Sequence, residues 1–421
     1  MKVGMGEKRS TARPPLGGRG PYYGPSGPDA PGTRRPSFMP EVRLEEWTTA
    51  DVALMSRALR LARRGQGRTA SNPRVGAVLA RRGEIVSEGW HRAFGAPHAE
   101  AEALRGIRGD TLYVTLEPCC HTGKTPPCTD AVISSGVRRV VIASLDPDRR
   151  MRGRGVLLLR RRGIRVEVGL LQRESRDLNR PYFLFKLRGR SHVTLKLAVS
   201  ADGRMAVGDG ASRWITGPKA RRLARSWRGR ADGVVVGIGT VMADDPHLIA
   251  EPRSRRPVRI VLDGRARTPV RSRLLDGAAP TVIVSGPGAT ASRRRELARR
   301  GASLLDIPEG PSGRIDLMAF LRAAARKGWI DLFVEGGRKV ADSLARLGAI
   351  DRLVLVQAPR LLGGSWSWTS DLGLKAIPSR TDFAAPEARR VGEDLVVTWV
   401  SRSSERTIQG WEPAAASRGR V

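Results

Sequence analysis

The chain contains two short stretches, PHAE at residues 97–100 and TLEPCCHTGKTPPC at residues 115–128, from which much of its fold and chemistry can be inferred. They supply one imidazole, from His98, and two thiols, from Cys119 and Cys128. This nitrogen and sulfur donor set suits Zn²⁺. Three protein ligands leave the fourth position of a tetrahedral zinc ion to water, which is typical of a catalytic site. The two stretches therefore predict a zinc centre with one open coordination position.

Glu100 follows the predicted imidazole ligand by two residues, so its carboxylate is close enough to face a zinc-bound water. Zinc lowers the pKa of such a water, and a nearby carboxylate can then carry a proton to the leaving group. Two alternatives remain open. Cys120 or His121 would complete a closed, structural zinc site, although neither explains Glu100. In the second alternative, Cys120 takes the place of Cys119 as a zinc ligand.

The three cysteines lie close together, and an odd number in one cluster is a poor disulfide framework. A metal or catalytic role in a reducing compartment is the better interpretation. The N-terminus lacks the apolar core of a secretory signal, and no stretch approaches the roughly 18 apolar residues that span a bilayer. We therefore expect a cytoplasmic protein with no membrane partner.

Alternating helices and apolar strands surround the predicted zinc site. In chain order they are a helix over 48–65, a hairpin over 74–91, a helix over 99–107, a strand over 111–116, a helix over 129–136 and a strand over 138–145. This order indicates a three-layer αβα domain.

A second block of alternating elements begins near residue 191, and it again indicates an α/β domain. Strands are predicted over 192–200, 232–238, 258–264, 280–286, 331–337 and 352–359, and helices over 217–229, 293–301 and 339–348. The full division comprises a disordered Pro- and Gly-rich extension over 1–46, a first domain over 47–190, a second domain over 191–400 and a disordered tail over 401–421.

The chain carries a net charge of +34, a value typical of a protein that binds polyanions. The excess is divided almost evenly between residues 47–190 and 191–400, and nearly all of it is arginine. We interpret it mainly as arginine on solvated faces. A weak, salt-sensitive interaction with nucleic acid is the alternative.

Three segments of the second block suggest ligand binding. Residues 232–240, DGVVVGIGT, resemble a dinucleotide fingerprint but lack its third glycine. Residues 333–337, FVEGG, run from a strand into glycines ahead of a helix, where unpaired N–H groups favour a phosphate. Residues 212–216, SRWIT, place an aromatic ring and hydroxyls before an arginine-rich helix. Taken singly, each segment is better explained by turn formation or packing.

The motifs of the first block resemble the zinc nucleobase deaminases, in which the Glu of an H-x-E motif is the general acid and base. With NPRVG at residues 72–76 and the inserted loop HTGKTPP at residues 121–127, the block looks like the riboflavin-biosynthesis bifunctional deaminase/reductase family. The implied substrate is 2,5-diamino-6-(5-phosphoribosylamino)pyrimidin-4-one, which loses its C2 amino group as ammonia. The implied roles are zinc ligation by His98, Cys119 and Cys128, proton transfer by Glu100 and substrate contact by Asn72.

The second block is similar to the reductase half of the same family, which resembles dihydrofolate reductase. The matching segments are LKLAVSADGR (195–204), ASRWITGPKAR (211–221), VGIGTVMADDPHL (236–248), VLDGRARTP (261–269), VEGG (334–337) and APRLLGG (358–364). The implied reaction is NADPH-dependent reduction of the ribose C1 carbon of the deaminated product. The implied NADPH contacts are Ala198, Trp214, Thr240, Asp244, Gly264, Gly337, Arg338, Lys339, Val340, Ala341, Asp342 and Ser343. The implied substrate contacts are Ser212, Arg228, Leu248 and Glu335.

Two positions depart from the family pattern. Cys120 stands where Ser or Asn is common, and we expect no effect on the chemistry. Glu251 stands where a substrate-binding Arg is usual. Arg253 or Arg255 would have to replace that Arg, since phosphate affinity in the reductase half would otherwise be weak.

The sequence therefore favours a bifunctional enzyme with Zn²⁺ and NADPH as cofactors, a small phosphoribosyl-pyrimidine substrate and no specific nucleic-acid partner. One alternative, prompted by Glu251, is a deaminase with a degenerate reductase half. Another, prompted by the net charge, is a nucleic-acid-binding or editing deaminase, although the first block lacks interleaved aromatic residues for base stacking. The sequence leaves open whether the chain forms a homo-oligomer.

Overall fold

The structure is a computed structural model. It describes residues 47–123, 125–207, 214–369, 372 and 382–413. The predicted disordered extension over 1–46 lies outside the described residues, as do Ser212 and the last eight residues of the predicted tail.

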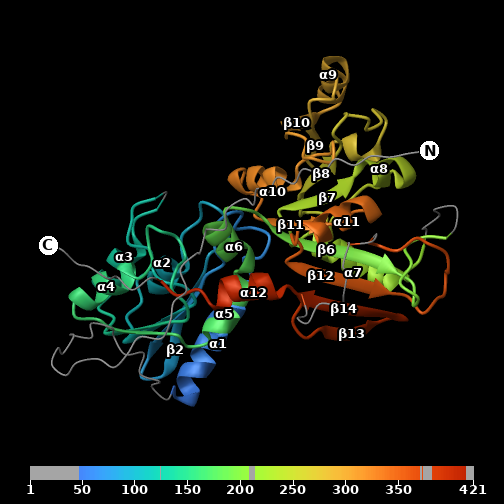
Figure 1. Cartoon of the computed structure of the whole chain (residues 1–421). Helices are drawn as coiled ribbons and strands as arrows, with labels where there is room; N and C mark the ends of the chain where they lie inside the picture. Colours follow the sequence, from blue (N-terminus) through green and yellow to red (C-terminus); the bar gives the residue numbers. More distant parts are fainter. Residues whose placement is uncertain (1–46, 124, 208–213, 370–371, 373–381, 414–421) are drawn as a thin grey trace, which may run out of the picture. The chain divides into compact units, whose positions relative to one another are not determined.

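The first half of the chain forms a five-stranded sheet with the strand order β2-β1-β3-β4-β5 (Figure 1). β1 runs antiparallel to β2 and β3, whereas β3, β4 and β5 are mutually parallel. The elements of this half are α1 (Thr49–Arg63), β1 (Gly76–Arg81), β2 (Glu84–Trp90), α2 (Ala99–Leu104), β3 (Thr111–Val114), α3 (Cys128–Ser134), β4 (Arg139–Ile142), α4 (Arg154–Arg161), β5 (Arg165–Val168), α5 (Gln172–Leu178) and α6 (Arg180–Arg188).

Helices cover both faces of this sheet because successive side chains of a strand point to opposite sides. On β1, Leu79 faces a core shared with α2, α3 and α4, whereas Val78 faces a core shared with α1. Both side chains are fully buried. The predicted three-layer αβα arrangement of the first domain is confirmed.

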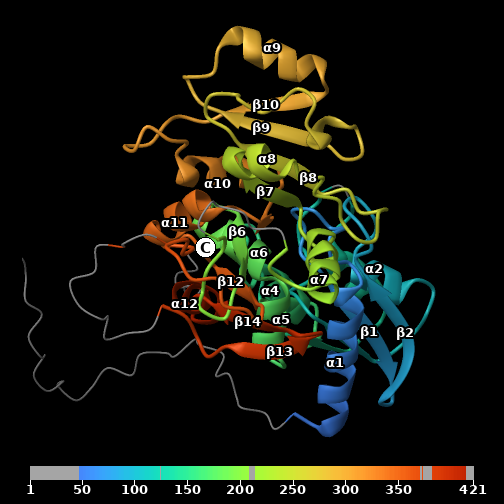
Figure 2. The same ribbon diagram turned by 90° about the vertical axis from the view of Figure 1, so that its right-hand side faces the viewer.

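The second half forms a nine-stranded sheet with the order β10-β9-β8-β7-β11-β6-β12-β14-β13 (Figure 2). The strands from β10 to β12 are parallel, and β14 and β13 close one edge with antiparallel pairing. The elements are β6 (His192–Val199), α7 (Pro218–Arg228), β7 (Gly233–Gly237), α8 (Ile238–Asp244), β8 (Val258–Leu262), η1 (Arg273–Leu275), β9 (Thr281–Ser285), α9 (Ala291–Arg299), β10 (Ala302–Asp306), α10 (Leu317–Arg326), β11 (Asp331–Val334), α11 (Arg338–Arg346), β12 (Arg352–Gln357), β13 (Glu387–Val391), β14 (Asp394–Val400) and α12 (Arg402–Gln409).

This sheet is also covered on both faces. Val235 faces the core that α10 and α11 close, and its neighbours Val234 and Val236 face the core that α8 and α9 close. Parallel strands need a crossover connection, so their carboxyl ends, and the loops that follow them, gather at one edge of the sheet. In open sheets of this kind, ligands bind at that edge.

The prediction of a disordered tail over 401–421 is wrong for its first part. Residues 402–409 form α12, and the side chain of Ile408 is fully buried against α6. A single large apolar residue in SRSSERTIQG gives too weak a helical pattern to be recognised, and the helix is stabilised by its tertiary contacts. In the described part of the chain, no helix is both long and apolar enough to cross a membrane.

Candidate active sites

The predicted zinc ligands lie at the starts of two helices and in the loop after a strand. His98 is the N-cap of α2, Cys128 is the first residue of α3, and Cys119 follows β3. The backbone N–H of Cys128 donates to Sγ of Cys119 at 3.3 Å, which fixes one thiol beside the other. Residues that are 30 positions apart in the chain thus meet where the two helices begin.

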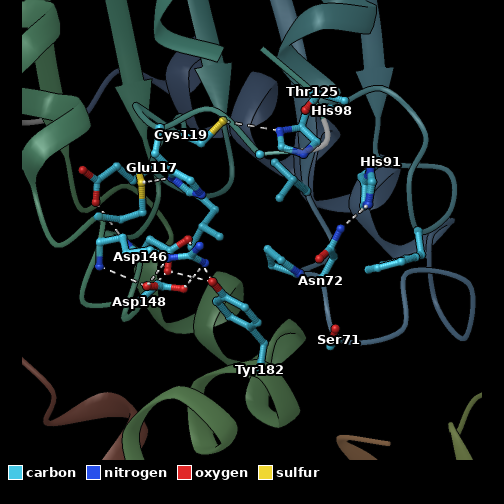
Figure 3. Close-up of a pocket in the computed structure, with 18 of the residues that line it drawn as sticks. Ser71, Asn72, His91, His98, Glu117, Cys119, Thr125, Asp146, Asp148 and Tyr182 are labelled. Atoms are coloured by element: carbon cyan, nitrogen blue, oxygen red, sulfur yellow. Dashed lines mark hydrogen bonds and ion pairs between the residues drawn. The ribbon is translucent and has the colours of Figure 1, made fainter. Parts of the chain in front are cut away.

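The donor atoms of His98, Cys119 and Cys128 all lie within 4.8 Å of one another. Nδ1 of His98 is 3.1 Å from Sγ of Cys128. It is 3.5 Å from Sγ of Cys119, a contact that Figure 3 shows. Tetrahedral zinc with ordinary Zn–N and Zn–S bonds holds such atoms roughly 3.5 Å apart. The three side chains therefore fit a zinc ion and leave one ligand position to water.

The two alternative ligands contact a different residue. Sγ of Cys120 lies 3.9 Å from Sδ of Met151, and Nδ1 of His121 lies 3.4 Å from the same sulfur. The geometry thus favours His98, Cys119 and Cys128 over a closed site that includes Cys120 or His121.

Glu100 lies in the first turn of α2 and is buried, with 3 % of its surface exposed. Its carboxyl group lines the same cavity as the imidazole and Cys119. Burial, together with the charge of Cys119, raises the pKa of Glu100 to about 7. A carboxyl group in this position can accept a proton and release it again near neutral pH.

The cavity beside the zinc ligands has a volume of about 340 Å³. Asn72 lies in its wall, and Nδ2 of Asn72 is 3.3 Å from Nε2 of His91. Nδ1 of His91 is 3.2 Å from the carbonyl oxygen of Pro97, which can only accept a hydrogen bond. His91 therefore carries its proton on Nδ1, and Nε2 accepts from the amide of Asn72. Because burial lowers the pKa of His91, the neutral ring is favoured and holds the Asn72 side chain in one orientation.

The opposite wall of the cavity contains residues that no sequence motif identified (Figure 3). Tyr182 donates to both carboxylate oxygens of Asp146, at 2.9 and 3.2 Å. Asp148 forms ion pairs with Arg150 at 2.9 Å and with Lys186 at 2.8 Å. Burial raises the pKa of Asp146 to about 7, whereas the two cations hold the pKa of Asp148 below its ordinary value despite burial. Tyr182 and Lys186 belong to α6, far along the chain, so no local motif announces this wall.

In the second half, two glycine turns face each other at the carboxyl ends of neighbouring parallel strands. β7 leads into α8, and β11 leads into α11. A Cβ atom on Gly337, the N-cap of α11, would lie 3.2 Å from Oγ1 of Thr240 in α8. On Gly336 it would lie 2.7 Å from Cβ of Val340, so glycine is required there. The start of α11 thus offers unpaired N–H groups in a cradle without side chains, which suits the phosphates of a dinucleotide.

Arg228 and Glu335 lie at this same edge and form a mostly buried ion pair. Nη2 of Arg228 donates to Oε2 of Glu335 at 3.1 Å, and Nε donates to Oε1. Nη1 of Arg228 also donates to the carbonyl of Ile249 at 3.0 Å, beside the buried side chain of Leu248. Although burial raises the pKa of Glu335, the charge of Arg228 holds it below its ordinary value. Both predicted substrate residues are therefore charged and held in place.

The other predicted cofactor residues lie around the same edge. Ala198 lies near the end of β6, Asp244 ends α8, and Gly264 follows β8. Trp214 is 63 % exposed, with the Arg221 guanidinium 4.6 Å above its ring.

The residues of the predicted 337–343 segment differ in their burial. Arg338, Lys339 and Val340 form the first turn of α11, whereas the side chain of Ala341 is fully buried in the core. Asp342 pairs with Arg346 at 3.2 Å, and Oγ of Ser343 donates to the carbonyl of Lys339 at 2.8 Å.

Comparison with known proteins agrees with this geometry. Residues 48–144 match the cytidine and deoxycytidylate deaminase zinc-binding region, and residues 191–397 match the RibD C-terminal domain. The riboflavin biosynthesis protein RibD of Aquifex aeolicus is 40 % identical over 354 residues, which cover 82 % of this chain and 97 % of the relative. The chain belongs to the RibD family.

Other members of the RibD family show the same relationship. The Escherichia coli protein is 38 % identical over 82 % of this chain and 98 % of its own length. A solved Acinetobacter baumannii RibD aligns with a TM-score of 0.74 and 32 % identity over 84 % of this chain and 99 % of that one. A Thermotoga maritima diaminohydroxyphosphoribosylaminopyrimidine deaminase/5-amino-6-(5-phosphoribosylamino)uracil reductase aligns with a TM-score of 0.72 and 31 % identity, over 83 % and 98 %.

Membership of the RibD family confirms several predictions. The fold is a deaminase domain followed by a reductase domain, and the protein is a bifunctional enzyme of riboflavin biosynthesis. Its cofactors are zinc and NADPH.

Glu251, which stands where a substrate-binding Arg is usual in the family, pairs with an arginine other than Arg228. Glu251 is half exposed and pairs with Arg225 at 3.3 Å. Of the two arginines suggested as replacements, Arg255 donates to the carbonyls of Gln66 and Gly67 at 2.7 and 2.6 Å. Its guanidinium is therefore engaged in holding the backbone near α1, and Arg253, which is exposed, remains the candidate.

Proposed function

We propose that residues 47–190 deaminate 2,5-diamino-6-(5-phosphoribosylamino)pyrimidin-4-one at C2, and that residues 191–400 then reduce the ribosyl chain. The final product is 5-amino-6-(5-phosphoribitylamino)uracil. The observation that carries the proposal is the buried Glu100, which lines one cavity with His98 and Cys119, while Cys128 completes their metal-binding group. The two activities named for the Thermotoga maritima relative support the choice of substrate.

In the deaminase half, His98, Cys119 and Cys128 would hold the metal. Bound zinc supplies a Lewis acid that lowers the pKa of a water molecule. Glu100 would take a proton from the attacking water as the water oxygen bonds to C2, and would give that proton to the amino group, which leaves as ammonia. Asn72, oriented by His91, donates or accepts a hydrogen bond at the edge of the pyrimidine ring.

In the reductase half, the protein mainly positions two reactants. NADPH supplies the hydride that reduces the ribosyl C1 carbon. The N–H groups at the start of α11, together with Thr240 of α8, would hold phosphate groups of NADPH, and Gly336 and Gly337 allow close approach of the backbone. Arg228, Glu335 and Leu248 would contact the substrate, whereas Ser212, the remaining predicted substrate residue, lies outside the described residues.

We further propose that the enzyme works in the cytoplasm on this small molecule, without a specific nucleic-acid partner. Clustered thiols that bind a metal favour a reducing compartment. The net charge of +34 attracts phosphorylated substrates without selecting among them.

A coupled assay tests the proposal. Purified protein with zinc is given the diaminopyrimidine phosphate and NADPH, and ammonia and NADPH oxidation are followed together. Equal amounts of ammonia released and NADPH oxidised are expected. Ammonia without NADPH oxidation would select the alternative in which the reductase half is degenerate, and the absence of ammonia would contradict the proposed function at its first step.

A further inference from the structure

The C-terminal helix α12 lies against the deaminase half, beyond the part of the chain that matches the RibD C-terminal domain. That match ends at residue 397, and α12 begins at Arg402. Figure 1 shows α12 beside α5 and α6. Ile408 packs in one apolar cluster with Phe183 and Leu184 of α6, and the ring of Trp411 meets Phe183 edge to face at 6.0 Å. The segment is therefore docked by a small core of its own.

Polar contacts hold the same segment along both helices. Nη2 of Arg173 in α5 pairs with Glu405 at 2.5 Å, and Nε2 of Gln409 donates to Asp177 at 2.7 Å. These contacts join residues more than 230 positions apart in the chain.

Arg176 of α5 is the centre of this contact. Its side chain is 1 % exposed, and Nη1 donates to the carbonyl of Gln409 at 2.7 Å and to that of Ile408 at 3.3 Å. Its guanidinium also lies 5.6 Å from the centre of the Trp411 ring. The carbonyls at the end of a helix carry partial negative charge, so the end of α12 stabilises a buried cation.

On its other side, Arg176 contacts Ser144, a buried residue in the loop after β4. Nε donates to Oγ of Ser144 at 3.3 Å, and the carbonyl of Ser144 accepts the N–H of Glu117 at 3.0 Å. The Glu117 carboxylate in turn accepts three backbone N–H groups from the segment that follows β4. They are those of Asp146 at 3.2 Å and of Gly153 and Gly155 at 2.9 Å.

Residues 146–155, which comprise this loop and the first two residues of α4, form one wall of the cavity. Asp146, Asp148, Arg150 and Met151 all line it, together with Glu117 itself. A continuous set of hydrogen bonds thus leads from the end of α12, through Arg176 and Ser144, to the wall that faces the predicted zinc ligands.

We propose that residues 401–412 are a functional part of the deaminase half, because they hold Arg176 as a positioning residue for the wall formed by residues 146–155. The deaminase unit is then discontinuous in sequence and includes a segment that follows the whole reductase domain. This inference rests on the proposed deaminase function.

The test uses full-length enzyme with Arg176→Met, which keeps the bulk of the side chain and removes its donors. We expect kcat/KM for ammonia release to fall about tenfold, mainly through KM, because the cavity wall loses the hydrogen bonds that Arg176 donates to Ser144 and to the carbonyls at the end of α12. Zinc content and the kinetics of NADPH oxidation with deaminated substrate should stay unchanged. Arg176→Lys should recover part of the loss, and Trp411→Ala, made in the C-terminal segment itself, should show a smaller loss of the same kind.

The matched control is Arg173→Ala, on the same helix and paired with the same α12, but without a contact to Ser144. It should leave ammonia release within twofold of the parent enzyme. Unchanged deaminase kinetics in Arg176→Met, or an equal fall of both activities, would overturn the inference.

Amide hydrogen exchange gives a readout that does not depend on catalysis. In Arg176→Met, peptides that cover residues 144–155 should exchange faster, whereas peptides that cover β7, β8 and β9 should not change. Unchanged exchange over 144–155 would also overturn the inference. If the parent enzyme releases no ammonia, the proposed function fails, and the exchange data still decide whether α12 holds this wall.

Discussion

Nδ1 of His98 lies 3.1 Å from Sγ of Cys128 because the N-termini of α2 and α3 meet at one end of the five-stranded sheet. Both residues precede or begin a helix, and the backbone N–H of Cys128 at the start of α3 donates to Sγ of Cys119, which helps to lower the pKa of that thiol. The zinc site is therefore built by the backbone as much as by the ligand side chains.

Replacing a predicted zinc ligand should remove the metal. We expect Cys128→Ser to lose most bound zinc and all measurable ammonia release, since a hydroxyl is a poor substitute for a thiolate. Zinc per chain is measured after dialysis by atomic emission. Cys120→Ser is the matched control: it changes the adjacent thiol, which contacts Met151, and should retain zinc and activity. Full zinc occupancy in Cys128→Ser would contradict the ligand assignment.

Glu100→Gln should separate metal binding from catalysis. The substitution keeps the size of a buried side chain and removes its ability to carry a proton. We expect zinc to remain bound while kcat for ammonia release falls about 100- to 10,000-fold, the range for loss of a general acid and base. NADPH oxidation with deaminated substrate serves as the internal control. Substantial residual deamination would show that another group moves the proton.

Glu335→Gln should impair the reductase half alone. It leaves Arg228, which is largely buried, without its carboxylate partner. We expect NADPH oxidation to fall about tenfold or more, since a buried charged hydrogen bond is lost, while ammonia release continues. Arg225→Ala is the matched control, because Arg225 lies on the same helix as Arg228 and forms an exposed pair with Glu251. Exposed pairs contribute less than about 1 kcal/mol, so this variant should leave NADPH oxidation nearly unchanged. Equal effects of the two substitutions would contradict a special role for the buried pair.

Asp232→Asn should change how stability depends on pH. Burial, with the nearby charge of Asp331, raises the pKa of Asp232 to about 7. An unfolded Asp titrates near 3.9, so between about pH 4 and 7 the native state keeps a proton that the unfolded state releases, and stability falls as pH rises through this range. Asn does not ionise, yet its side-chain oxygen can still accept the N–H groups of Ile330 and Asp331.

The variant should therefore be more stable than the parent at pH 8, by on the order of 1 kcal/mol, and gain little near pH 4. Urea unfolding at both pH values measures this difference. A gain of equal size at both would show that ionisation of Asp232 is not its cause.

Local sequence predicted most of what depends on residues near one another in the chain. His98, Glu100, Cys119 and Cys128 lie in two short motifs, so their chemistry could be inferred before any fold was known. The α/β class followed from apolar runs and helical spacing, which are properties of single elements. Helix α4 and strand β5 were not predicted because arginines flank their few apolar residues in RGVLLLRR and RVEV.

Which distant residues complete each site depends on tertiary packing. The cavity wall of Asp146 and Tyr182 joins a loop after β4 to helix α6, and the support of Arg176 comes from α12 near the end of the chain. Both involve polar groups that are stable in the interior only when paired, and their partners lie far away in sequence. Local patterns in the sequence were thus sufficient for the two domain types and the zinc chemistry. Only packing determined that the expected disordered tail begins with a helix against the deaminase half, because a short helix of weak propensity forms only where a partner surface buries it.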